Sequence, residues 1–120
     1  MKLAFLLFCT LGLLVAQGPE VEGNFDIRIE PTAVLQTGVQ VPFQITVKDS
    51  LGKPVNRAKV TFQIETTEHT HVKVFPAPGI DGGNYIAKPV FPVEGDWNVY
   101  VEVRLDNRMS GRTKQFSVGS

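Results

Sequence analysis

Hydrophobic and polar residues alternate along most of the chain after residue 24. The pattern is clearest in DWNVYVEVRLD, residues 96–106, where every second residue from Trp97 to Leu105 is hydrophobic. Alternation with a period of two is typical of a β-strand with one buried face. No window places hydrophobic residues at helical spacing. The chain is therefore predicted to be all-β, with Trp97 buried in the core.

Shorter segments repeat this alternation and are separated by residues that favour turns. The predicted strands are FDIRIE (residues 25–30), VQVPFQITVKD (39–49), KVTFQIE (59–65) and TKQFSV (113–118), and the predicted turns are residues 49–54, 76–84, 92–96 and 106–112. Pro42 cannot donate to a strand ladder and predicts an edge or a bulge. Gly111, in the last predicted turn, can take positive φ. About seven short strands at this spacing predict an immunoglobulin-like antiparallel β-sandwich over residues 24–118.

The start of the chain has a different composition. Residues 1–17, MKLAFLLFCTLGLLVAQ, place Lys2 before a hydrophobic run that ends at Ala16. The run is shorter than the roughly 20 residues of a transmembrane helix and is typical of a secretory signal peptide. An uncleaved membrane anchor is the alternative, because Leu14 fits poorly at the cleavage site. Export to the periplasm or the cell exterior is expected.

Cysteine and charge narrow the class of protein. The only cysteine, Cys9, lies inside the predicted signal peptide, so the exported domain would rely on its hydrophobic core and not on disulfides. This favours a bacterial envelope protein. Lysine and arginine number 12 against 12 acidic residues and form no cluster, so nucleic acid is not an expected partner. No nucleophile motif or phosphate-binding loop is present, so neither enzyme activity nor a small-molecule substrate is expected.

The only two histidines, His69 and His71, are two residues apart. If KVTFQIE continues as a strand, both face solvent on one side, and Val72 and Val74 face the core. Two imidazoles on one strand face can ligate a single Cu(II), Zn or Ni ion. Met109 is the only methionine beyond the predicted signal peptide and would favour copper as a third ligand. The alternative is that both histidines are ordinary exposed residues at a strand end.

The order of these motifs resembles a known family. VKDSLGKPVNRAKVTFQI (residues 47–64) is similar to the D-x-x-G-x-P-V-x-x-A-x-V signature of bacterial immunoglobulin-like domains. EHTHV (68–72), GGNYIAKPVF (82–91) and EGDWNVYVEV (94–103) follow, with a Gly-x-Tyr and then a Gly-x-Trp strand. Over residues 25–118 the chain thus resembles the YtkA-like and FixH-like group of exported or membrane-anchored β-sandwich domains.

The resemblance implies an accessory function. Some members of that group accompany copper handling or the assembly of copper-containing respiratory oxidases, and their segment equivalent to Thr66–Val72 is often rich in Met and His. Here the segment keeps both histidines but has no methionine, and neither has FPVE at residues 91–94. The implied function is weak copper binding in support of a membrane complex. The alternative is a metal-independent module that binds an envelope protein through edge strands or loops.

Overall fold

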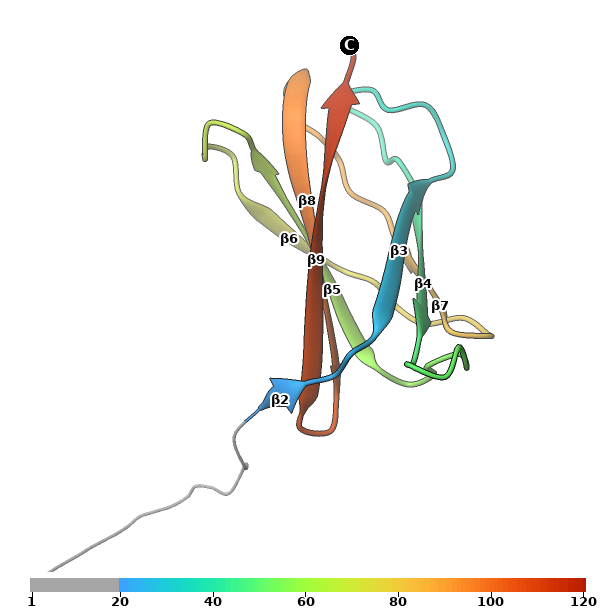
Figure 1. Cartoon of the computed structure of the whole chain (residues 1–120). Helices are drawn as coiled ribbons and strands as arrows, with labels where there is room; N and C mark the ends of the chain where they lie inside the picture. The colour runs from blue at the N-terminus through green and yellow to red at the C-terminus, as the bar shows by residue number, and fades with distance from the viewer. Residues whose placement is uncertain (1–19) are drawn as a thin grey trace, which may run out of the picture.

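The computed structural model describes residues 20–120, so the predicted signal peptide lies outside the described residues. Residues 20–120 form eight strands and no helix. The strands make two sheets that pack against each other (Figure 1). No segment in that range therefore offers a helix able to cross a membrane. The predicted all-β sandwich is confirmed.

The two sheets differ in size. The larger sheet has the order β2-β9-β8-β5-β6, and the smaller has the order β3-β4-β7. Every strand pairing is antiparallel except that of β2 with β9. The strands are β2 (Val21–Glu22), β3 (Asp26–Pro31), β4 (Phe43–Lys48), β5 (Lys59–Thr66), β6 (Lys73–Pro76), β7 (Asn84–Ala87), β8 (Gly95–Leu105) and β9 (Arg108–Val118).

The core lies between the sheets and is built from the alternate inward positions of the strands. Trp97 is fully buried, as the alternation of β8 predicts, and its ring lies edge-on to Phe91 with ring centroids 5.3 Å apart. Phe43 of one sheet contacts Phe62 of the other, with centroids 4.9 Å apart. Each fully buried side chain of this size contributes about 1.5–3 kcal/mol. The sandwich therefore has a well-filled hydrophobic core without a disulfide.

Two predictions about the strand at residues 39–49 are wrong. Val39 was expected to face inward, but it is 46% exposed and precedes the strand, because β4 begins only at Phe43. Pro42 lies immediately before β4, the middle strand of its sheet, and not on an edge. Its carbonyl accepts the Thr32 amide at 2.9 Å. The pairing keeps one register from Gln40 with Val90 to Phe43 with Ala87, so there is no bulge either. Proline is accommodated because it faces Thr32, just past the end of β3, where no ladder hydrogen bond is needed.

The last hairpin is tighter than predicted. Leu105 pairs directly with Arg108, so the turn consists of two residues, and the first of them, Asp106, has φ 58°. Aspartate tolerates this left-handed conformation, which two-residue hairpin turns require. Gly111 lies inside β9 and is not at positive φ. The position requires glycine because Tyr100 of β8 packs over it, and a Cβ atom here would collide with the tyrosine side chain.

The short strand β2 fastens the start of the described chain to β9. The amides of Val21 and Gly23 donate to carbonyls of the β8–β9 hairpin, each at 2.9 Å. The buried Ser110 hydroxyl donates to Glu22 Oε2 at 2.5 Å and accepts the Phe25 amide at 3.1 Å. Hydrogen bonds from Ser110 and then from the backbone lower the pKa of the Glu22 carboxyl.

The attachment of β2 is expected to weaken in acid. The folded-state pKa of Glu22 lies below its unfolded value of about 4.3, so the stabilisation is present above that value and is lost as the pH falls through the folded pKa. The measurement is the hydrogen-exchange protection factor of the Gly23 amide between pH 6 and pH 3. Glu22→Gln should abolish the pH dependence. The same pH profile in both proteins would contradict this role of Glu22.

Candidate functional site

Both histidines lie in the connection between β5 and β6, not in a strand. β5 ends at Thr66 and β6 begins at Lys73. His69 and His71 have φ angles of 64° and 55°, in the left-handed region. The prediction that the strand continues through them is therefore wrong. Val72 and Val74, predicted to face inward, are 52% and 62% exposed.

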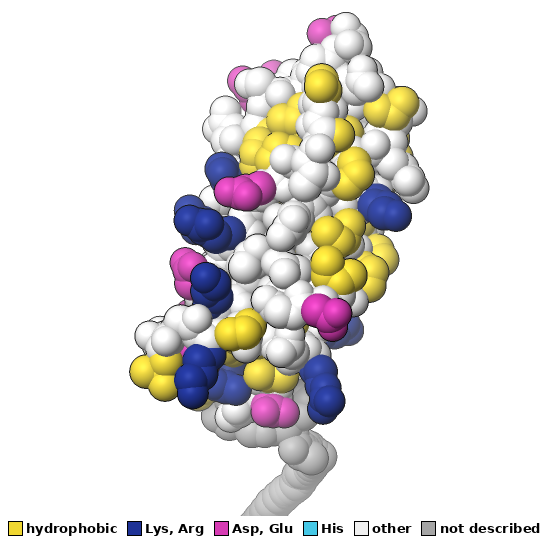
Figure 2. Space-filling view, turned by 90° about the vertical axis from the view of Figure 1, so that its right-hand side faces the viewer, with side chains coloured by type: hydrophobic (Ala, Val, Ile, Leu, Met, Phe, Trp, Pro, Cys, Tyr) yellow, Lys and Arg dark blue, Asp and Glu magenta, His cyan; other side chains and the backbone are white. Residues whose placement is uncertain are grey.

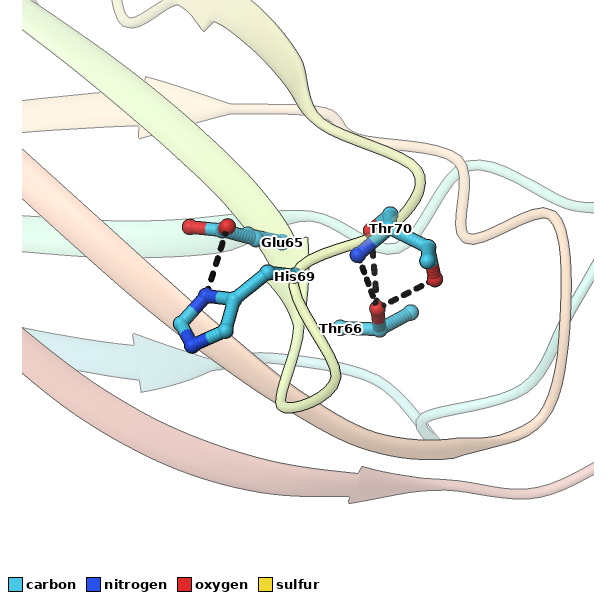
Figure 3. Close-up of polar contacts among 4 residues, drawn as sticks. All are labelled: Glu65, Thr66, His69 and Thr70. Carbon is cyan, nitrogen blue, oxygen red and sulfur yellow. Dashed lines mark hydrogen bonds and ion pairs between the residues drawn. The ribbon is translucent and has the colours of Figure 1, made fainter.

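The chain leaves the strand because Thr66 and Thr70 close the connection on itself (Figure 3). The Thr66 hydroxyl accepts the Thr70 amide at 2.8 Å and lies 2.8 Å from the Thr70 carbonyl oxygen and 2.6 Å from the Thr70 hydroxyl. The amide of His69 donates to the Thr66 carbonyl at 2.8 Å. Threonine hydroxyls that bond to nearby backbone groups compete in this way with strand pairing. The left-handed histidines are thus a consequence of this closed turn.

Thr66→Val is expected to lower the free energy of unfolding by about 1 kcal/mol, because it keeps the side-chain volume but removes the hydroxyl that the Thr70 amide needs. The connection between β5 and β6 should also become more mobile. Urea unfolding measures the first effect, and the exchange rate of the Thr70 amide measures the second. Thr67→Val is the control, since Thr67 is exposed and only its backbone amide is bonded, to the Asp96 carbonyl. Equal effects of both substitutions would contradict a specific role for the Thr66 hydroxyl.

His69 approaches the outer face of the larger sheet. Its Nδ1 lies 2.9 Å from Glu65 Oε2, and its side chain is 77% exposed (Figure 3). An ionised carboxylate only accepts hydrogen bonds, so the contact requires a proton on Nδ1. In the neutral imidazole the lone pair then resides on Nε2, which is open to solvent. Histidines that bind a metal usually donate their other ring N–H to a carboxylate or a carbonyl in this way.

His71 approaches a different part of the molecule. Its ring centroid lies 6.4 Å from that of Trp97, which belongs to the core between the sheets. The imidazole also lines a hollow of about 290 Å³ at the end of the sandwich, with Glu68, Glu94 and Asp96. Since His69 is beside the outer-face Glu65, the two histidines are not neighbours on one strand face. The predicted arrangement, with both imidazoles side by side on one strand face, is therefore not found.

Met109 lies far from both histidines. It pairs with Arg104 near one end of β8, while the histidine-bearing connection follows Thr66, which pairs with Trp97 near the other end. The seven residues that separate these positions on β8 span about 23 Å. The structure thus does not bring Met109 together with the histidines. Across residues 20–120, no three His, Asp or Glu side chains converge as metal ligands would.

A second feature of the surface was not predicted in detail. A groove of about 520 Å³ lies beside β6 and β7, in the region of the predicted turn at residues 76–84. Figure 2 shows hydrophobic side chains gathered along the right-hand side of the smaller sheet, where this part of the surface comes into view. One sequence signal for it was Ile80, a large hydrophobic residue within a Pro/Gly/Asp segment. The main lining side chains are Phe75, Pro76, Pro78, Ile80, Ile86 and Lys88.

Comparison with known proteins identifies a family. A family model described as YtkA-like matches residues 20–102. The match runs from β2 into β8 and includes both the histidine-bearing connection and the groove. No curated protein matches the chain.

Proposed function

The chain belongs to the YtkA-like family, and from this premise we propose that it is an exported accessory domain, not an enzyme, which binds another protein of the bacterial cell envelope. The observation that carries the proposal is the hydrophobic groove beside β6 and β7. Ile80 on its rim is 61% exposed, and Phe75 and Ile86, which also line it, are half-buried. Contiguous exposed hydrophobic surface of this kind usually marks a site of interaction.

Site-specific photo-crosslinking in living cells tests this function. A photoreactive amino acid at Ile80 is expected to capture one discrete partner. The same amino acid at Thr113, which is exposed on β9, should not. The captured protein, once purified, should bind the wild-type domain, and Ile80→Ser should weaken that binding at least tenfold. Failure of Ile80 to crosslink, or an identical set of products from both positions, would contradict the proposal.

Copper handling is the second candidate function, and one observation favours it. Glu65 holds His69 with Nε2 open to solvent, as a metal ligand would be held. A tight copper site needs several ligands around the ion. Among the described residues, no group of three His, Asp or Glu side chains could supply them around His69. Any copper bound here would therefore be held weakly through His69, unless a second protein contributes further ligands.

Titration with Cu(II) and Cu(I) distinguishes binding by His69 alone from binding by both histidines. His69→Ala should remove binding and Glu65→Gln should weaken it, whereas His71→Ala and Met109→Leu should leave it unchanged. Equal affinities of the wild type and His69→Ala would end the copper hypothesis. Loss of binding in both single histidine variants would instead show that the connection rearranges to bring both imidazoles onto one ion.

A further inference from the structure

The free edges of the two sheets are not equally protected. On β3, the carbonyl oxygens of Ile27 and Ile29 point away from β4, and side chains of β9 occupy them. Arg112 Nη1 donates to Ile27 O at 2.7 Å, and Lys114 Nζ lies 3.3 Å from Ile29 O. A new strand that paired with β3 would have to displace both cations. This edge is therefore closed to a partner by side chains of the domain itself.

The outer edge of β7 is covered as well, by the segment that follows β6. The Ile86 amide donates to the Pro78 carbonyl at 3.1 Å, and the Ile80 amide donates to the Asn84 carbonyl at 2.8 Å. These bonds place residues 78–80 alongside β7 as an irregular extra strand. The Ile86 amide and the Asn84 carbonyl on that side of β7 are consequently already paired, and residues 78–80 cover the edge.

β6 has an open edge. The Ala77 amide donates to the Val60 carbonyl at 3.1 Å, so Val60 and Ala77 form a hydrogen-bonded pair that continues the β5–β6 ladder. Pairs alternate along antiparallel strands, so Phe75 is in a hydrogen-bonded pair with Phe62, and Val74 opposite Gln63 is not. The N–H and C=O groups of Val74 therefore point away from β5, into solvent. Natural sheets usually protect such an edge with charged residues or proline. Here Lys73 and Pro76 lie at the two ends of β6, so the open part of this edge is at Val74.

The groove lies directly beside this edge, since Phe75 and Pro76 line it. A strand added to β6 would direct alternate side chains towards Phe75 and Ile80. Lys88 is the only charged side chain that lines the groove, and it is exposed. The described residues place no carboxylate within salt-bridge distance of it. An incoming segment with an acidic group opposite Lys88 would supply that charge.

We propose that an extended segment of the partner protein adds a strand to β6 at Val74, with hydrophobic residues at alternate positions in the groove and a carboxylate opposite Lys88. The inference rests on the proposed binding function and specifies how the partner is held. Main-chain hydrogen bonds to Val74 give affinity, and the groove selects the side chains, as in other cases of strand addition.

Synthetic octapeptides test this mode of binding by NMR titration of the full chain. The probe alternates Val with Ser or Thr and carries one Glu. One matched peptide has Lys in place of Glu, and another has N-methyl groups on alternate amides. The Glu peptide should cause saturable shifts in residues 72–80 and 86–88 and slow exchange of the Val74 amide at least tenfold. Affinity should fall at least tenfold for the Lys and N-methyl peptides.

Two charge reversals complete the test. Lys88→Glu should invert the preference, so that the Lys peptide binds more tightly than the Glu peptide. Lys53→Glu is the control, since Lys53 is exposed in the β4–β5 connection and does not line the groove. Absence of saturable shifts, or shifts outside the groove, would overturn strand addition. Shifts that grow with protein concentration alone would show that a second copy occupies β6. If Ile80 still crosslinks a partner when every peptide fails, the binding function stands and this mode of binding does not.

Discussion

Replacing Gly83 with alanine is expected to lower the free energy of unfolding by about 3 kcal/mol. Gly83 has φ 77°, and a Cβ atom there would lie 2.6 Å from the carbonyl oxygen of Val47. That oxygen cannot move away easily, because it accepts the Val55 amide at 3.0 Å. The substitution therefore adds a backbone collision to the strain of a left-handed alanine.

Gly82→Ala is the matched control for this prediction. Gly82 has φ 70°, but the nearest atom to its added Cβ, Asn84 Nδ2, is 3.5 Å away, an ordinary contact. Only the left-handed strain of about 1 kcal/mol is expected. Urea unfolding of both variants measures the difference. If the two variants lost the same stability, the close approach of Gly83 to β4 would have no energetic consequence.

Tyr85→Phe is expected to cost about 2 kcal/mol, although it removes only one oxygen atom. Tyr85 is buried, and its hydroxyl donates to the Val55 carbonyl at 2.7 Å and accepts the Ala58 amide at 3.1 Å. Phenylalanine leaves both backbone groups without that partner. The hydroxyl thereby fixes the connection between β4 and β5 against β7.

Tyr100→Phe provides the comparison. Tyr100 is half-buried, and its hydroxyl has one partner, Glu102 Oε1, at the long distance of 3.4 Å. A change below about 0.5 kcal/mol is expected. Thermal unfolding of the two variants should separate them clearly. Similar melting temperatures would mean that the Tyr85 hydroxyl is replaced by water or that the connection is not held by it.

Much of the fold could be predicted from alternation alone. Phe43, Phe62, Trp97 and Val101 are all fully buried, and each sits at a predicted inward position. Their strands lie inside the sheets and pack one face against the other sheet. Every second residue is therefore buried, which gives the period of two. Val74 was placed by the same alternation, but the turn after Thr66 shifts it, so Phe75 pairs with the buried Phe62 and Val74 pairs with Gln63 on the outer face of the larger sheet. Hydrophobic character alone did not distinguish the two situations.

The arrangement of the candidate site was harder to predict. The path of the chain after Thr66 depends on hydrogen bonds between two threonines four residues apart, which compete with the continuation of the strand. Histidine adopts the left-handed conformation more often than most residues, but far less often than glycine. A single tight turn therefore changed the neighbours of both histidines. The separation of Met109 from them could be known only once the register of β8 and β9 was established.

The parallel pairing of β2 with β9 also has a mechanical consequence. β2 enters at one end of the sandwich and β9 leaves at the other, as Figure 1 shows. Near the exit, Gly119 is bonded to Leu35 and Thr37 in a second parallel contact. When the two ends of the domain are pulled apart, both contacts are loaded in shear, so their bonds must break together and not one after another. The domain should thus resist tension between its ends better than its few terminal hydrogen bonds would suggest.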